Sequence, residues 1–217
     1  MGLHCGYLVA AVEPDALLLE LSRHAGAFVA GALVERVADA DIDPGRFDLL
    51  LGGGDGRAFL VDTSMMLSTN ADMIIAMSDV LGTVVGAGAE TVSGSYWLTV
   101  ARDGELLRHA FMSYASLTLG MSIGDPLASE DEFPLVDSSG DGVFAAMATF
   151  GLDPSAWLDS GPATVVTFDA TRFPHNGAVD AIRRRHFEQY GRPEDAWLHE
   201  IVAVEASPSR RPNAAER

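Results

Sequence analysis

The chain has 217 residues, of which 48% are apolar, so one ordinary domain can bury a sizeable core without cross-links. Its single cysteine, Cys5, excludes an intramolecular disulfide, and the absence of lysine excludes a Walker A loop and Schiff-base chemistry. The formal net charge of −17 disfavours general binding to nucleic acid, because acidic groups repel the phosphates.

The first third of the chain predicts short strands with one early helix. Residues 7–12 form an apolar run typical of a buried strand, and Pro14 then suits the first turn of a helix. We expect a strand over 27–37, where the apolar pattern also fits a helix. Two apolar runs flank the glycine-rich stretch 52–56, which indicates a hairpin. Such glycines could bring amides close to a phosphate, but the G-x-G-x-x-G spacing is missing.

The middle of the chain carries its clearest patterns. Asn70 suits a helix N-cap, and apolar residues at helical spacing continue to Val84, so we expect a helix that Gly86 and Gly88 end. Residues 96–112 then combine aromatic and β-branched runs around Asp-Gly, which predicts a β-hairpin.

Further strands and helices are expected towards the C-terminus. The expected elements are a third strand near 117–119, loop over 124–142, a helix over 143–150, a strand over 164–168, a helix from 176 to 190 and a strand over 198–204. Irregular mixing of strands and helices favours an α+β fold with a mainly antiparallel sheet and packed helices. We expect a single domain over 1–205 and a disordered tail over 206–217, which lacks core-forming residues.

A serine pattern offers one catalytic hypothesis. Residues 120–124 match the G-x-S-x-G nucleophile elbow around Ser122, and Asp169 and His175 follow in the chain order of a hydrolase triad. The alternative interpretation is a glycine-rich strand end. Pro126 favours it, because a proline so soon after the serine disfavours the helix that an elbow needs. A small serine hydrolase is therefore the alternative function, not the first.

An acidic stretch resembles the opening of a calcium loop. Asp137, Ser139 and Asp141 occupy the first, third and fifth positions of an EF-hand loop. Ala148 occupies the twelfth position, where that loop requires a bidentate glutamate. Helix capping explains these residues better, so we expect neither a metal nor another cofactor, and this trio is only an alternative metal site.

The charge is unevenly distributed along the chain. Residues 1–171 hold six arginines against twenty-four acidic residues, a balance of −18, whereas residues 172–217 have a balance of +1. An acidic face of this kind could receive a basic protein, although solubility alone also explains it. The candidate partner-binding residues lie in two acidic stretches: Asp39, Asp41, Asp43, Glu130, Asp131 and Glu132. The first functional hypothesis is therefore a non-enzymatic protein-binding module.

A resemblance supports an interaction role. From Ser93 to Pro154 the predicted order is strand, Asp-Gly turn, strand, acidic loop and a helix followed by Leu-Asp-Pro. This order resembles uncharacterised domains of high-GC actinobacteria, some of them encoded near toxin and immunity genes. The resemblance implies an immunity-like role and carries no catalytic residues. A structural or regulatory homodimer built on the 96–111 hairpin is a further hypothesis.

The sequence also sets an expectation for location. The apolar run at 7–12 is shorter than a secretory signal needs, and acidic residues follow it at once. Other apolar stretches are broken well short of the ~18–20 residues of a membrane span. We therefore expect a cytoplasmic protein that meets other proteins and neither nucleic acid nor membranes.

Overall fold

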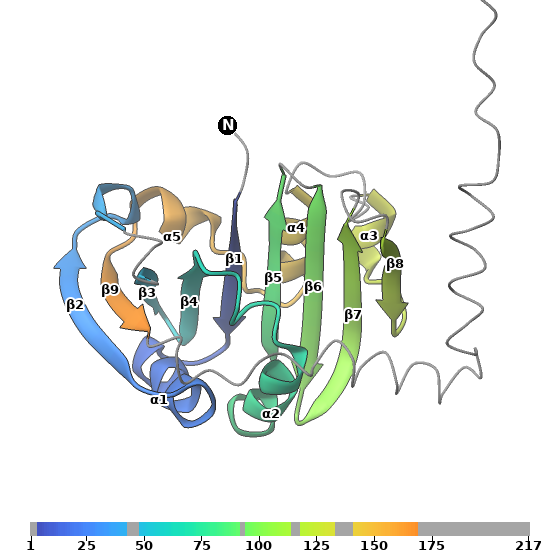
Figure 1. Ribbon diagram of the computed structural model, residues 1–217, viewed down its shortest axis with the longest axis horizontal. Helices are drawn as coiled ribbons and strands as arrows, with labels where there is room; N and C mark the ends of the chain where they lie inside the picture. Colours follow the sequence, from blue (N-terminus) through green and yellow to red (C-terminus); the bar gives the residue numbers. More distant parts are fainter. Residues whose placement is uncertain (1–3, 43–47, 92–93, 114–117, 133–140, 169–217) are drawn as a thin grey trace, which may run out of the picture. The chain divides into compact units, whose positions relative to one another are not determined.

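The computed structural model describes residues 4–42, 48–91, 94–113, 118–132 and 141–168. Over these residues the chain forms one nine-stranded sheet with the order β2-β9-β3-β4-β1-β5-β6-β7-β8 (Figure 1). Every neighbouring pair of strands is antiparallel. The predicted α+β fold with a mainly antiparallel sheet is confirmed. The helix predicted from 176, the strand at 198–204 and the tail lie outside the described residues.

The bounds of the elements follow the chain. The strands are β1 (His4–Ala10), β2 (Phe28–Val34), β3 (Asp48–Gly54), β4 (Arg57–Asp62), β5 (Val84–Glu90), β6 (Ser95–Arg102), β7 (Glu105–Ser113), β8 (Thr118–Ile123) and β9 (Ala163–Phe168). The helices are α1 (Pro14–Ala25), α2 (Ala71–Leu81), α3 (Ala128–Glu132), α4 (Asp141–Ala148) and α5 (Ser155–Ser160), with a 3-10 turn, η1 (Val37–Asp39).

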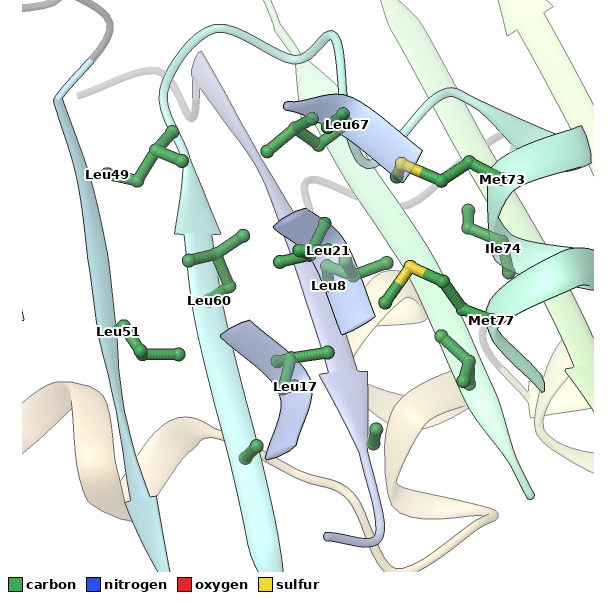
Figure 2. Close-up of a cluster of buried hydrophobic side chains, with 14 of the residues drawn as sticks. Leu8, Leu17, Leu21, Leu49, Leu51, Leu60, Leu67, Met73, Ile74 and Met77 are labelled. Carbon is green, nitrogen blue, oxygen red and sulfur yellow. The ribbon is translucent and has the colours of Figure 1, made fainter. Parts of the chain in front are cut away.

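Helices cover both faces of the sheet, so each face buries its own core. On one face α1 and α2 pack against alternate strand residues, and Figure 2 shows this cluster: Leu8, Leu17, Leu21, Leu49, Leu51, Leu60, Leu67, Met73, Ile74 and Met77. On the other face α4 and α5 supply Val143, Met147 and Trp157. Burial on both faces explains why strands β1, β4 and β5 read as continuous apolar runs.

Helix α2 begins where the sequence predicts and ends earlier. The Oδ1 atom of Asn70 accepts a hydrogen bond from the amide of Met73 at 3.1 Å, which confirms the N-cap. The expectation that Gly86 and Gly88 end the helix is wrong. The helix stops at Leu81, because Gly82 has a φ of 76° that breaks helical geometry.

Glycines 86 and 88 belong instead to strand β5, where they make room for large side chains on the α2 face. A Cβ atom on Gly86 would collide with the side chain of Ile74, and one on Gly88 would collide with the ring of Trp97. The side chains of Ile74 and Trp97 each need a residue without a side chain beneath them, so glycine here indicates close packing and not a helix end.

Both predicted hairpins are confirmed. Each turn has two residues with positive φ, Asp55-Gly56 between β3 and β4 and Asp103-Gly104 between β6 and β7, which is the geometry of a type I′ turn. One amide of the glycine loop is occupied within the chain, since the amide of Gly56 donates to Oε1 of Glu13 at 3.0 Å. The third strand near 117–119 is also confirmed as β8.

Two short helices were not predicted. Helix α3 lies within the stretch expected to be loop, and α5 follows Pro154. Helix α3, with the sequence Ala-Ser-Glu-Asp-Glu, has no apolar stripe, and α5 has only six residues, too few for helical periodicity to detect. Helix α3 nevertheless positions one of the residues of the candidate site described below.

The segment between β4 and α2 is organised by one buried carboxylate. Asp62, fully buried, accepts hydrogen bonds from the hydroxyls of Ser64 and Ser68 and from the amides of Leu67 and Ser68, at 2.6 to 2.9 Å. These bonds fold the chain back from the end of β4 to the start of α2.

Replacing Asp62 by alanine is expected to lower the free energy of unfolding by about 3 kcal/mol, because buried donors then lose their acceptor. Asp62→Asn, which keeps one acceptor oxygen, should lose less, and Asp72→Ala, in the first turn of α2, should cost less than about 1 kcal/mol. Urea denaturation monitored by circular dichroism measures all three. Equal losses for Asp62→Ala and Asp72→Ala would contradict the assigned role.

Candidate functional site

The most densely bonded polar cluster in the described part of the chain centres on Arg108. This residue lies in the middle of β7, and its side chain is only 4% exposed. Its Nε donates to Oε1 of Glu130 at 2.8 Å, and its Nη2 donates to Oε2 at 2.7 Å. A bidentate pair of this kind fixes both side chains, so α3 is joined to β7 on the α4 face of the sheet.

Glu130 is placed by helix α3 and held from two sides. Its Oε1 also accepts from the amide of Leu127 at 2.9 Å, one turn earlier in the chain. Burial alone would raise the pKa of the Glu130 carboxyl, but the hydrogen bonds from Arg108 and Leu127 and the charge of Arg108 outweigh it and hold that pKa below its usual value. The carboxylate is therefore ionised and already occupied by a partner within the chain.

Ser122 is the third member of the Arg108 cluster. It lies on β8 opposite Ala110, and its Oγ accepts from Nη1 of Arg108 at 2.8 Å. The same Nη1 donates to the carbonyl of Ile123 at 3.1 Å. The serine hydroxyl thus helps to satisfy a buried guanidinium, which is a structural task that needs no catalysis.

The geometry around Ser122 differs from a nucleophile elbow. Strand β8 continues beyond the serine to Ile123, and α3 begins only at Ala128, whereas an elbow places its serine on the turn itself. Among the described residues, the Ser122 hydroxyl makes no hydrogen bond to a histidine or carboxylate. The proposed triad partners, Asp169 and His175, lie outside the described residues.

A buried histidine lies next to Arg108 in sequence but on the opposite face of β7. Nδ1 of His109 is 2.9 Å from Oγ1 of Thr99 on the neighbouring strand. Burial, aided by the charge of Arg108, lowers the pKa of His109 to about 4. The imidazole is therefore neutral at physiological pH. Within the described part of the chain, Nε2 of His109 has no hydrogen-bond partner.

The indole nitrogen of Trp97 is a second buried polar atom for which the described residues supply no partner. It does not converge with His109 on one site. The ring of Trp97 lies over Gly88 of β5 and close to Gly6 of β1, whereas His109 is on the other neighbour of β6. The two orphaned atoms are therefore separate features of the core.

The hypothetical calcium loop is only partly described. Asp137 and Ser139 lie outside the described residues, and Asp141 is the exposed first residue of α4. Among described residues no group of three or more histidine, cysteine, aspartate or glutamate side chains could hold a metal ion.

One end of the sheet gathers acidic side chains. The register aligns Ala10 with Ala58 and Val84, and Val84 with Ala101, so the turns that follow or precede these residues share an end. This is the end at which α1 begins and α2 stops (Figure 1). The acidic rim is defined as the six exposed carboxylates there: Glu13, Asp15, Asp55, Asp79, Asp103 and Glu105.

The two arginines near the acidic rim do not neutralise it. Arg102 donates from Nε to Oγ1 of Thr83 at 2.8 Å, and its guanidinium lies 5.7 Å from the centroid of the Phe150 ring. Arg57 is exposed at the start of β4. Six carboxylates against two arginines leave a balance of −4 (six negative, two positive) at this end of the sheet.

The acidic residues chosen from the sequence fall elsewhere. Asp39 is bound by Arg36 in a surface pair at 2.7 and 2.8 Å, Asp41 and Asp131 are exposed, and Glu130 is held by Arg108. Glu132 ends α3, and Asp43 lies outside the described residues.

Sequence reasoning missed the acidic rim, because its members are scattered from residue 13 to residue 105. The available signal was the acidic residue in each Asp-Gly turn, at positions 55 and 103, since two hairpins of one sheet can place their turns at the same end.

Comparison of the chain with profiles of known protein families, with curated proteins and with solved structures yields no match. Across the described residues, no helix has both the length and the apolar character needed to cross a membrane.

Proposed function

We propose that this protein is a non-enzymatic binding module whose acidic rim receives a basic protein partner. The carrying observation is the convergence of six exposed carboxylates on one end of a rigid sheet, where turns and helix ends present them together. Clustered charge of one sign steers an oppositely charged protein and fixes its orientation. The net charge of −17 extends this attraction over the whole chain.

Two further features support a binding role. The polar cluster with the most hydrogen bonds, around Arg108, is closed on itself by Glu130 and Ser122, so it serves the fold. Residues 93–154 resemble domains encoded near toxin and immunity genes, and an immunity-like protein acts by stoichiometric binding. The proposed partner is therefore a protein with exposed arginine and lysine.

The test begins with a tagged pull-down from lysate of the native host, at low and at high salt. A basic protein recovered stoichiometrically at low salt is then measured against two variants. The rim variant combines Asp55→Asn, Asp103→Asn and Glu105→Gln, and the control variant combines Asp41→Asn, Asp131→Asn and Asp159→Asn. Both remove three negative charges at exposed positions, so they share the same change in net charge. Asparagine tolerates the positive φ of both turns.

The rim variant is expected to bind about tenfold more weakly at low salt, equivalent to about 1.4 kcal/mol, and the control variant less than about threefold. At high salt the difference should shrink, because surface charges are screened. Titration calorimetry or surface plasmon resonance measures both. Equal losses for the two variants would show that only net charge matters, and recovery of no basic protein would overturn the proposal.

A further inference from the structure

Among the described strands, β2 lies at one edge of the sheet and is apolar. Over the described residues it is the outermost strand, paired only with β9. Its seven residues, Phe-Val-Ala-Gly-Ala-Leu-Val, include no charge, and its five central residues are exposed. Val29 is 67% exposed and Leu33 is 76% exposed. Edge strands are usually blunted by charge or proline, and β2 has neither.

A β-bulge divides β2 into two halves. Ala30 aligns with Val166 and Leu33 aligns with Thr164, so Gly31 and Ala32 together face the single residue Val165. One extra residue reverses the side-chain alternation. Ala30 and Leu33 therefore lie on the α1 face of the sheet.

Val29 and Val34 lie on the opposite face. Phe28, on the α1 face, stacks with Phe168, and Val34 packs with the core of the other face, which agrees with the reversal.

We propose that β2 pairs antiparallel with β2 of a second copy of this chain, about a twofold axis between Gly31 and Ala32. In this register Ala30 lies opposite Leu33 of the second copy, and Val29 opposite Val34. Each opposing pair lies on one face, which is what continuous antiparallel pairing requires. A bulge ordinarily disturbs pairing at an edge. Here it lies at the axis, where each copy contributes the same irregularity, so the contact is isologous.

Charge at the ends of β2 complements this pairing. The register brings Glu35 of one copy opposite Phe28 of the second copy, next to the last turn of α1. That turn carries Arg23, whose side chain is 56% exposed and already pairs with Glu20 of its own helix. Glu35 is exposed, and in the dimer it joins this pair at both ends of the neutral strand, because the twofold axis doubles the contact. The second copy is the occupant that fits, because it carries the same bulge at the matching position.

The site of dimerisation differs from the one the sequence suggested. Both strands of the hairpin are paired on both sides: β6 pairs with β5 and β7, and β7 pairs with β6 and β8. Among the described strands, the hairpin therefore has no free edge with which to extend the sheet, whereas β2 has one.

The first test is the mass of the full chain by sedimentation velocity over a range of micromolar concentrations. The wild type is expected to be a dimer, and Leu33→Lys a monomer, because a charge is placed against an apolar neighbour. Val80→Lys is the matched control, since Val80 is 60% exposed on α2, and it should remain a dimer. A monomeric wild type, or a dimer that survives Leu33→Lys, overturns the proposal. Circular dichroism checks that each variant is folded.

The second test fixes the register by disulfide trapping in a Cys5→Ser background. The double variant Ala30→Cys, Leu33→Cys should form intermolecular disulfides, because the two positions oppose each other across the axis. Ala30→Cys alone should not, since the bulge leaves like positions two ladder steps apart, about 7 Å along the strands in addition to about 5 Å between them, and a disulfide needs Cα atoms within about 7 Å. Equal cross-linking of the single and double variants, or none in either, overturns the register.

Discussion

Replacing Arg108 by methionine is expected to lower the free energy of unfolding by about 3–5 kcal/mol, because it leaves the Glu130 carboxylate without its partner in a largely buried position. Glu130 is 12% exposed, and both of its oxygens receive hydrogen bonds from Arg108. Without the guanidinium, the carboxylate must either remain unpaired or take up a proton. The loss should appear as a lower midpoint in urea denaturation.

The double variant Arg108→Met, Glu130→Met separates the ion pair from the packing around it. Replacing both partners with apolar side chains of similar volume is often neutral for stability, so the double variant should recover most of what the single variant loses. Arg102→Met is the matched control, since this exposed arginine should cost less than about 1 kcal/mol. A loss for Arg108→Met no greater than that of Arg102→Met would show that the cluster does not stabilise the fold.

Local chemistry explains which elements could be predicted from the sequence. The Asp-Gly pairs at 55–56 and 103–104 need positive φ at both positions, and few other residues supply it, so both hairpins follow from their turns. Asn70 caps α2 through its own side chain, a contact made three residues away. Such signals depend only on neighbours in the chain, and each is visible in a short window of sequence.

The end of α2 could not be predicted in the same way. Val84 continues the helical spacing, yet it begins a strand, because β5 is stabilised by pairing with β1 and β6 on either side. Long-range pairing overrides local periodicity at this point. Strand β9 likewise lies between β2 and β3, a position that 163–168 alone does not encode.

The contacts of the candidate site are also set by long-range pairing that the local sequence does not encode. Arg108 and Glu130 are 22 residues apart, and only the pairing of β7 with β8 and the return through α3 bring them together. Glu130 was selected from the sequence for its charge as a partner-binding residue, whereas the fold uses that charge internally. Sequence composition gives the sum of charges correctly but cannot tell which of them the fold has already paired.

The free energy of unfolding should depend on the protonation of His109 between pH 6.5 and about 4. The pKa of His109 is lowered from 6.5 to about 4, first by burial and then by the charge of Arg108. Between these values the unfolded chain binds a proton that the folded chain does not, so stability falls as the pH falls through this range. The full effect of a shift of this size is about 3 kcal/mol.

The stabilisation from Glu130 is present above the usual glutamate pKa of 4.5 and is lost as the pH falls through the lowered pKa of the folded protein.

The variant His109→Asn places an amide near Thr99 and does not titrate. The slope of the free energy of unfolding between pH 6.5 and 4.5 should therefore be smaller than in the wild type, whatever the stability at pH 7. Val80→Asn, at an exposed position of α2 that does not titrate, is the control and should keep the wild-type slope. Unchanged slopes in both variants would contradict the assignment to His109.

The two clusters on opposite faces of β7 are also coupled through Arg108. Its charge contributes to lowering the pKa of His109, so removing that charge should bring the pKa closer to 6.5 and reduce the slope above pH 4.5. Denaturation of the double variant Arg108→Met, Glu130→Met at several pH values, compared with His109→Asn, measures the coupling, because this variant leaves no unpaired Glu130 carboxylate that could itself take up a proton. A wild-type slope in the double variant would leave burial as the whole cause. A reduced slope would show that the charge of Arg108 contributes to keeping His109 neutral on one face of the sheet while it joins α3 to the other.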